Sequence, residues 1–207
     1  MTMGSRWRFQ MAAPMLLDWT KLWPLVLTSS VIAAFLTYGL GLLKDWFNRS
    51  RDADFAALYV ALTLEDYASR CASVVGDIDT FWSSRGSAGS SHENVPELGA
   101  FGADVEWKAL GVKLTSKALS FRIRIGRTRG MLTDLSQHVN EEIVEEAHDH
   151  AVKLGLDALA AADHFRKVRR LGPAPSVADW STRDWLQEKA DKIAVRKAAE
   201  KAAMADD

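Results

Sequence analysis

VALTLEDYASRCASVVGDIDTF, residues 60–81, has no proline and one glycine, and its apolar side chains recur at alternating intervals of four and three. A repeat of 3.5 residues is typical of a helix that buries one stripe against neighbouring helices. We therefore predict an all-α fold built on this helix, with Cys71 as a buried small hydrophobe rather than a reactive thiol. The predicted stripe consists of Val60, Leu64, Tyr67, Cys71, Val74, Ile78 and Phe81.

Upstream of this helix, Leu22–Leu43 holds 22 residues without a charge, between Lys21 and Lys44. A helix of that length is about 33 Å long, enough to cross a hydrocarbon core of about 30 Å. Tryptophans near both ends suit the two membrane interfaces. We predict a short N-terminal segment, 1–21, and one transmembrane helix, 22–43. A buried core helix and a cleaved signal peptide are the alternatives, but both usually have shorter apolar regions.

One face of the predicted span carries small residues at every fourth position: Ser29, Ala33, Thr37 and Gly41. Such a face lets helices approach closely in lipid, which suggests self-association or a protein partner in the bilayer, although small residues are common in any span. Basic residues flank the span three against three. A start at Met11 or Met15 would remove two of the preceding three and favour a cytoplasmic C-terminal region.

The rest of the chain divides into a helical region, 44–172, and a C-terminal helix and tail, 173–207. Within the helical region, 83–103 is rich in Gly and Ser and is expected to be a flexible loop, or else a lid that uses Arg85, His92 and Glu93. A short helix is expected over 104–110. These elements, with the helices below, make a bundle of three or four helices.

The next predicted helix covers 113–136, with Thr115 or Ser116 as its N-cap. Phe121–Ile125 alternates in the way a strand does, which is the competing interpretation.

A longer helix is predicted over 139–171. Basic residues, then Gly172 and Pro173, end it, as helix stop signals do. Its four stripe alanines imply a closely packed neighbour. The expected stripe is Ile143, Ala147, Ala151, Leu154, Ala158, Ala161, Phe165 and Val168, and the basic residues are Arg166, Lys167, Arg169 and Arg170.

The last predicted helix covers 179–203. Ser176–Asp179 caps it, and Trp180, Trp185, Leu186 and Ile193 dock it.

Glu145 and His148 have the Glu-x-x-His spacing found in di-iron helical bundles, which need two such motifs and two further glutamates. This sequence has one motif, so we predict no metal and no other cofactor. A metal-binding bundle enzyme that uses Glu145, His148 and carboxylates from 65–79 is the alternative. Phosphate-binding loops, nucleophile elbows and zinc-protease motifs are absent from the sequence, and no catalytic residue is predicted.

A local basic cluster consists of Arg122, Arg124, Arg127 and Arg129, in a chain whose net charge is −1. The simplest interpretation is a solvated face paired with nearby carboxylates. Anionic lipid headgroups are the next candidate, because they attract basic segments near a membrane. Nucleic acid is not expected as a partner, because the chain as a whole has no positive field.

Several segments resemble a group of uncharacterised bacterial proteins with one N-terminal span. They include Ala61–Ala68 with Cys71, Pro96–Leu98, Glu106–Leu110 and Ala118–Arg122. The resemblance implies the inner membrane of a bacterium and no assigned activity. The sequence therefore predicts a single-pass, membrane-anchored helical interaction or scaffolding module, not an enzyme. A metal-binding enzyme and an anionic-lipid sensor remain the alternatives.

Overall fold

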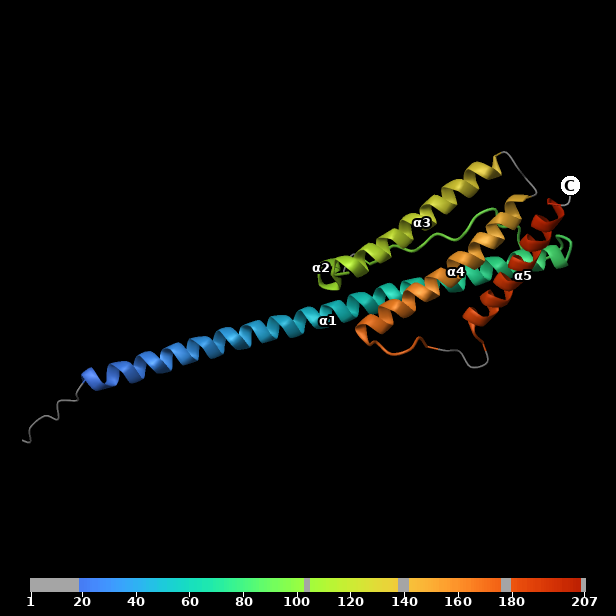
Figure 1. Cartoon of the computed structure of the whole chain (residues 1–207). Coiled ribbons are helices and arrows are strands. Elements are labelled where there is room, and N and C mark those ends of the chain that lie inside the picture. The colour runs from blue at the N-terminus through green and yellow to red at the C-terminus, as the bar shows by residue number, and fades with distance from the viewer. Residues whose placement is uncertain (1–18, 103–104, 138–141, 176–179, 206–207) are drawn as a thin grey trace, which may run out of the picture. The chain divides into compact units, whose positions relative to one another are not determined.

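A computed structural model of the chain describes residues 19–102, 105–137, 142–175 and 180–205 (Figure 1). Within these ranges the chain forms helices and no strand, so the all-α prediction is confirmed for them. The helices are α1 (Trp19–Ser83), α2 (Trp107–Leu110), α3 (Val112–Ser136), α4 (Glu142–Arg169) and α5 (Thr182–Ala203).

The chain separates into two compact units, Met1–Phe47 and Asn48–Asp207, and α1 contributes to both. Across the described residues, no helix combines the length and the apolar character that a membrane span requires. Most of the predicted span, 22–43, lies outside the residues whose side chains are described, and so does its small face, Ser29, Ala33, Thr37 and Gly41. The transmembrane helix therefore stays a prediction.

In the second unit, the stripe predicted on α1 forms the centre of the core. Five of its seven members are fully buried: Val60, Leu64, Tyr67, Cys71 and Ile78. The other two, Val74 and Phe81, are half-buried, while Val75 is fully buried in place of Val74. From residue 60 to residue 78 the buried positions follow 3.6 residues per turn, the period of a straight α-helix, so the strict 3.5 repeat drifts off the core face by one position.

Helices α1 and α4 run antiparallel. Glu65 contacts Arg166, position 71 lies against position 155, and Asp79 contacts His148, so residue numbers rise on α1 as they fall on α4. Helix α5 also runs antiparallel to α4, because Arg183 pairs with Asp163 near its start and Arg196 pairs with Asp149 near its end. Helix α3 joins the core through Phe121, whose ring meets that of Tyr67 edge to face at 6.0 Å.

The close neighbour implied by the alanines of α4 is present. Ala147, Ala151 and Ala158 are fully buried in the same core cluster as Ala61, Ala68 and Cys71 of α1. The closest approach is at Gly155. A Cβ at this position would lie 3.1 Å from Cys71 Cβ and 2.8 Å from Leu186 Cδ1, so α1, α4 and α5 meet there. Of the predicted stripe, only Val168 is exposed.

The N-cap predicted at Thr115 or Ser116 is wrong. Helix α3 begins at Val112 after Gly111, and the Thr115 hydroxyl donates to the Trp107 carbonyl instead of capping a helix. A positive φ of 81° at Gly111 turns the chain from α2 directly into α3.

Helix α5 begins at Thr182, and Ser181 caps it by accepting a hydrogen bond from the Asp184 N–H. The predicted cap, Ser176–Asp179, lies outside the described residues. Trp180 is exposed, so it does not dock the helix as expected, whereas Leu186 is fully buried and Trp185 and Ile193 are partly buried.

The segment expected as a flexible loop packs along the bundle instead. Val95, Leu98 and Phe101 are buried in the core. Arg129 of α3 donates to the Val95 carbonyl, and Asn94 donates to the Arg129 carbonyl and to the Thr133 hydroxyl. These contacts hold an extended segment against α3, which is also visible in Figure 1. The prediction of a flexible loop, made from the Gly and Ser content of 83–103, overlooked these three core residues.

The strand interpretation of Phe121–Ile125 is also wrong, and the reason is specific. Phe121 and Ile125, four residues apart, are buried against the core, while Ile123 is 55% exposed. Apolar residues on two opposite faces of one helix therefore imitate the alternation of a strand.

Replacing Gly155 with Ala tests the close approach of α1, α4 and α5. The added methyl group overpacks the contact with Cys71, so the free energy of unfolding should fall by about 1–3 kcal/mol. Urea unfolding of the full chain in mild detergent, followed by far-ultraviolet circular dichroism, measures this change. Gly130→Ala is the matched control, because nothing lies within 4 Å of a Cβ there and the variant should gain about 0.5–1 kcal/mol. Equal effects of the two variants would contradict the packing.

Candidate functional site

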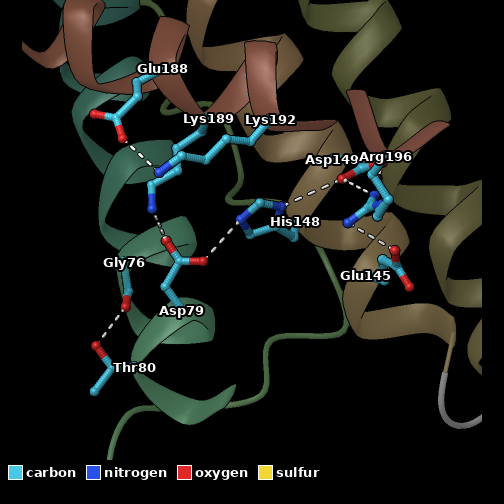
Figure 2. Close-up of polar contacts among 10 residues, drawn as sticks. All are labelled: Gly76, Asp79, Thr80, Glu145, His148, Asp149, Glu188, Lys189, Lys192 and Arg196. Carbon is cyan, nitrogen blue, oxygen red and sulfur yellow. Dashed lines mark hydrogen bonds and ion pairs between the residues drawn. The ribbon is translucent and has the colours of Figure 1, made fainter. Parts of the chain in front are cut away.

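A cluster of charged residues joins α1, α4 and α5 around His148 (Figure 2). His148 is 5% exposed and its ring lies between two carboxylates. Its Nε2 is 3.4 Å from Asp79 Oδ1, and its Nδ1 is 3.5 Å from Asp149 Oδ1. The Trp82 ring covers it at 5.2 Å between centroids. Lys189 of α5 pairs with the other oxygen of Asp79 at 2.6 Å.

Asp149 is the most heavily bonded carboxylate of this cluster. Arg196 Nη2 donates to both of its oxygens, at 2.9 and 2.7 Å, and Lys197 Nζ lies 2.7 Å from Oδ2. Burial raises the pKa of Asp149, but the hydrogen bonds from His148, Lys197 and Arg196 outweigh burial and hold that pKa well below its ordinary value. Asp149 is therefore an anionic anchor for α5 at neutral pH.

The two residues proposed as metal ligands do not turn toward one point. Glu145 pairs with Arg196 Nη1 at 2.8 Å, while His148 lies between Asp79 and Asp149. Within the described ranges, no group of three or more His, Cys, Asp or Glu side chains could hold a metal ion. Cationic side chains of α5 occupy the carboxylates that a metal would need, so the geometry of this cluster is that of an interhelical clasp.

The opposite end of α4 carries a second set of interhelical ion pairs. Arg166 is 7% exposed, and its Nε and Nη2 donate to the two carboxylate oxygens of Glu65, at 2.6 and 3.0 Å. Arg169 donates to Asp54 at 2.8 Å and to the Ser50 carbonyl at 2.9 Å. Two of the basic residues expected only to end the helix therefore bind α1. The helix does end there, because Arg170 adopts a φ of 54° and the Leu171 N–H donates to the Arg166 carbonyl.

The Cys71 thiol, in the core, is not a reactive group. Its side chain is fully buried, and burial raises the pKa of its thiol to about 12. The prediction of a buried small hydrophobe is confirmed. Tyr67 lies beside it, and burial together with Cys71 raises the pKa of the Tyr67 hydroxyl far above its ordinary value. Neither group offers a nucleophile at neutral pH.

The four arginines of the predicted basic cluster have different environments. Arg124 pairs with Asp157 at 3.1 Å and stacks over the Phe121 ring, and Arg129 bonds the Val95 carbonyl. Arg122 and Arg127 are exposed, and no ion pair to either occurs among the described residues. Among the described residues, the expected pairing with a nearby carboxylate is therefore seen for Arg124 and not for the other three arginines.

Sequence reasoning missed two features of α3. The first is a pair of exposed lysines, Lys113 and Lys117, that extend the basic cluster toward the start of the helix. The second is an exposed apolar set, Val112, Leu119 and Ile123, which borders an open groove of about 690 Å³ with Trp107. The signal for both is in the sequence: at 3.6 residues per turn, these apolar and basic residues of 112–130 fall on the face opposite the core and on its flanks.

The lid residues suggested by the sequence have structural roles or lie in solvent. Arg85 has a φ of 54° at the turn that ends α1, His92 pairs with Asp77 at 3.0 Å, and Glu93 is exposed. Among the described residues, none of these three side chains contacts a titratable group of the His148 cluster.

Arg166→Lys tests the fork of hydrogen bonds to Glu65. Lysine keeps the charge but cannot donate to both oxygens in one plane, so we expect a loss of about 1–2 kcal/mol in the free energy of unfolding. Arg166→Ala, which leaves the carboxylate without its partner, should cost about 3–5 kcal/mol. Urea unfolding measures both. The exposed Arg170, replaced by Lys, is the control; a wild-type value for Arg166→Lys would contradict the role of the fork.

Asp149→Asn tests the clasp and should cost about 2 kcal/mol at pH 7. Because the folded pKa of Asp149 is lowered, its contribution is complete above the unfolded pKa of about 4 and is lost as pH falls through the folded value. The difference between wild type and variant should therefore shrink as pH falls from about 5 to below about 4. Unfolding free energies measured across that range check this, and a difference that grows with acid would contradict it.

In comparisons with known proteins, no family model, no curated protein and no solved structure matches this chain. The resemblance to bacterial single-span proteins therefore stays a prediction, and the function has to be argued from the residues themselves.

Proposed function

We propose that this protein is a single-pass, membrane-anchored helical module that acts by presenting a binding surface rather than by catalysis. The observation that carries the proposal is the uncharged sequence Leu22–Leu43, between Lys21 and Lys44, inside a segment that is helical from Trp19 to Ser83. A helix satisfies its own backbone hydrogen bonds, as a membrane span must. Among the described residues, the rest of α1 together with α3, α4 and α5 supplies the bundle that the anchor would hold at the membrane.

The arrangement of the bundle supports a role in presentation. Its buried polar groups, including His148, Asp149 and Arg166, are used to hold helices together. Its accessible surface, in contrast, carries exposed apolar residues on α3, together with cations that have no ion pair with another described residue. Exposed apolar residues gathered on one helix are a common mark of an interaction surface. The bacterial inner membrane, with the bundle in the cytoplasm, is the proposed location, and a lipid bilayer is the proposed partner of 22–43.

The small face, Ser29, Ala33, Thr37 and Gly41, is proposed as the contact between copies within the bilayer. Small side chains at every fourth position allow close backbone approach between spans, which is the physical basis of this part of the proposal.

Alkaline carbonate extraction of membranes from bacteria that express the full chain tests the anchor. We expect the protein to stay in the membrane pellet and to enter solution only with detergent. Val31→Arg with Leu36→Arg places two charges in the span and should release most of the protein, because each costs about 2.5–3.5 kcal/mol at the centre of a bilayer. Val195→Arg with Ala198→Arg, on the exposed part of α5, adds the same charge as a control. Wild-type protein in the carbonate supernatant would contradict the proposal.

A further inference from the structure

We propose that the outer face of α3 binds an anionic lipid surface, by inserting a strip of apolar side chains between two flanks of lysine and arginine. This inference deepens the proposed function, because it names the surface that a membrane-anchored module would present. It concerns α3 and its neighbours in the second unit only.

Helix α3 is apolar on two opposite faces. Leu114, Ala118, Phe121, Ile125 and Leu132 are buried and hold it to the bundle. At 3.6 residues per turn, Val112, Leu119 and Ile123 fall on the other side, where they are 86%, 41% and 55% exposed. We call these three residues the outer strip. The bundle buries the first face, and the outer strip remains in contact with water.

The surroundings of the outer strip are open. Gly126 and Gly130 continue the same side of the helix, and nothing lies within 4 Å of a Cβ at either position. Toward the start of the helix, the groove lined by Trp107, Val112, Leu119 and Ile123 extends the apolar surface. No other described part of this chain covers it, so an external partner has access along the length of the helix.

The charge of α3 decides the chemistry of that partner. From Val112 to Thr133 the sequence has six basic residues and no acidic one, although the chain as a whole carries a net charge of −1. Arg124 and Arg129 are engaged with Asp157 and with the Val95 carbonyl. Four cations remain exposed, and no ion pair to them occurs among the described residues: Lys113, Lys117, Arg122 and Arg127.

The four exposed cations lie on both sides of the outer strip. Lys113, Lys117 and Arg127 fall on one flank of the helix, and Arg122 falls on the other. A helix that lies in a membrane interface has this cross-section, because aliphatic stems of Lys and Arg follow the apolar surface while their charges reach the headgroups. A nucleic acid would use the cations but leave Val112, Leu119 and Ile123 in water, so an anionic bilayer fits the surface better.

A label on the outer strip tests the inference in the full chain. Ile123→Cys can be labelled with an environment-sensitive NBD fluorophore, since Cys71 is fully buried and will not compete. The protein is reconstituted into vesicles of phosphatidylcholine alone or with about 30% phosphatidylglycerol. We expect a blue shift and protection from iodide quenching in the anionic vesicles only, reversed by about 0.5 M salt.

Arg122→Gln with Arg127→Gln should lower the ratio of inserted to water-exposed label about 30-fold, because each basic residue near an anionic surface contributes a factor of about five. Lys192→Gln with Lys201→Gln on α5 removes the same charge elsewhere and should change nothing. A label at Val195→Cys, 72% exposed on α5, should stay in water in both vesicles.

Three results would overturn the inference. The label emission is equal in neutral and anionic vesicles, or it ignores the arginine substitutions, or the blue shift disappears when the protein is diluted within the bilayer. The last result would assign the outer strip to a second copy of the chain. Vesicle flotation of the same samples reports the anchor separately. If the chain does not float with neutral vesicles, the proposal of a membrane anchor is wrong. Labelled protein added to preformed anionic vesicles then still tests the binding of α3 by itself.

Discussion

The close approach of α4 to α1 at Gly155 is the constraint on which the rest of the bundle depends. A Cβ at Gly155 would sit 3.1 Å from Cys71 Cβ, a distance tighter than most real Cβ contacts. The alanines of α4, buried at positions 147, 151 and 158, keep the two helices near along three further turns. Because the interface is built from small side chains, its energy depends on backbone proximity and dense packing rather than on large apolar groups.

That proximity determines which long side chains can meet. Arg166 reaches both oxygens of Glu65 at one end of α4, and His148 reaches Asp79 at the other. The two contacts fix the antiparallel register, because a shift of α4 by one residue would separate both pairs together. Buried ion pairs contribute modestly to stability but penalise every register in which one partner is left alone. Specificity of assembly thus explains why Arg166, Glu65, His148 and Asp79 lie at this interface.

How much of this arrangement is predictable from sequence depends on whether the signal is local. The stripe of α1, the burial of Cys71 and the alanine face of α4 follow from periodicity along one helix, and the structure bears them out except at Val74 and Phe81 of the stripe. Gly155 carried no such signal, since its role depends on residues more than thirty positions away on two other helices. Glu145 and His148 matched a metal-site spacing, but Arg196, some fifty residues later, takes Glu145. Spacing on one helix cannot reveal a partner brought by the fold.

Helix α3 shows how a local pattern can be sound and still be misinterpreted. Phe121, Ile123 and Ile125 alternate in sequence, yet two of them face the core and one faces out. A helix needs only one apolar face to join a bundle. The second apolar face of α3 contributes nothing to the packing, and it exposes Val112, Leu119 and Ile123 to water, which is unfavourable. Four exposed cations, Lys113, Lys117, Arg122 and Arg127, flank the same side and have no ion pair with another described residue. The anionic lipid surface proposed as the partner of α3 would cover the outer strip and attract the flanking charges at the same time, so one partner would account for both features.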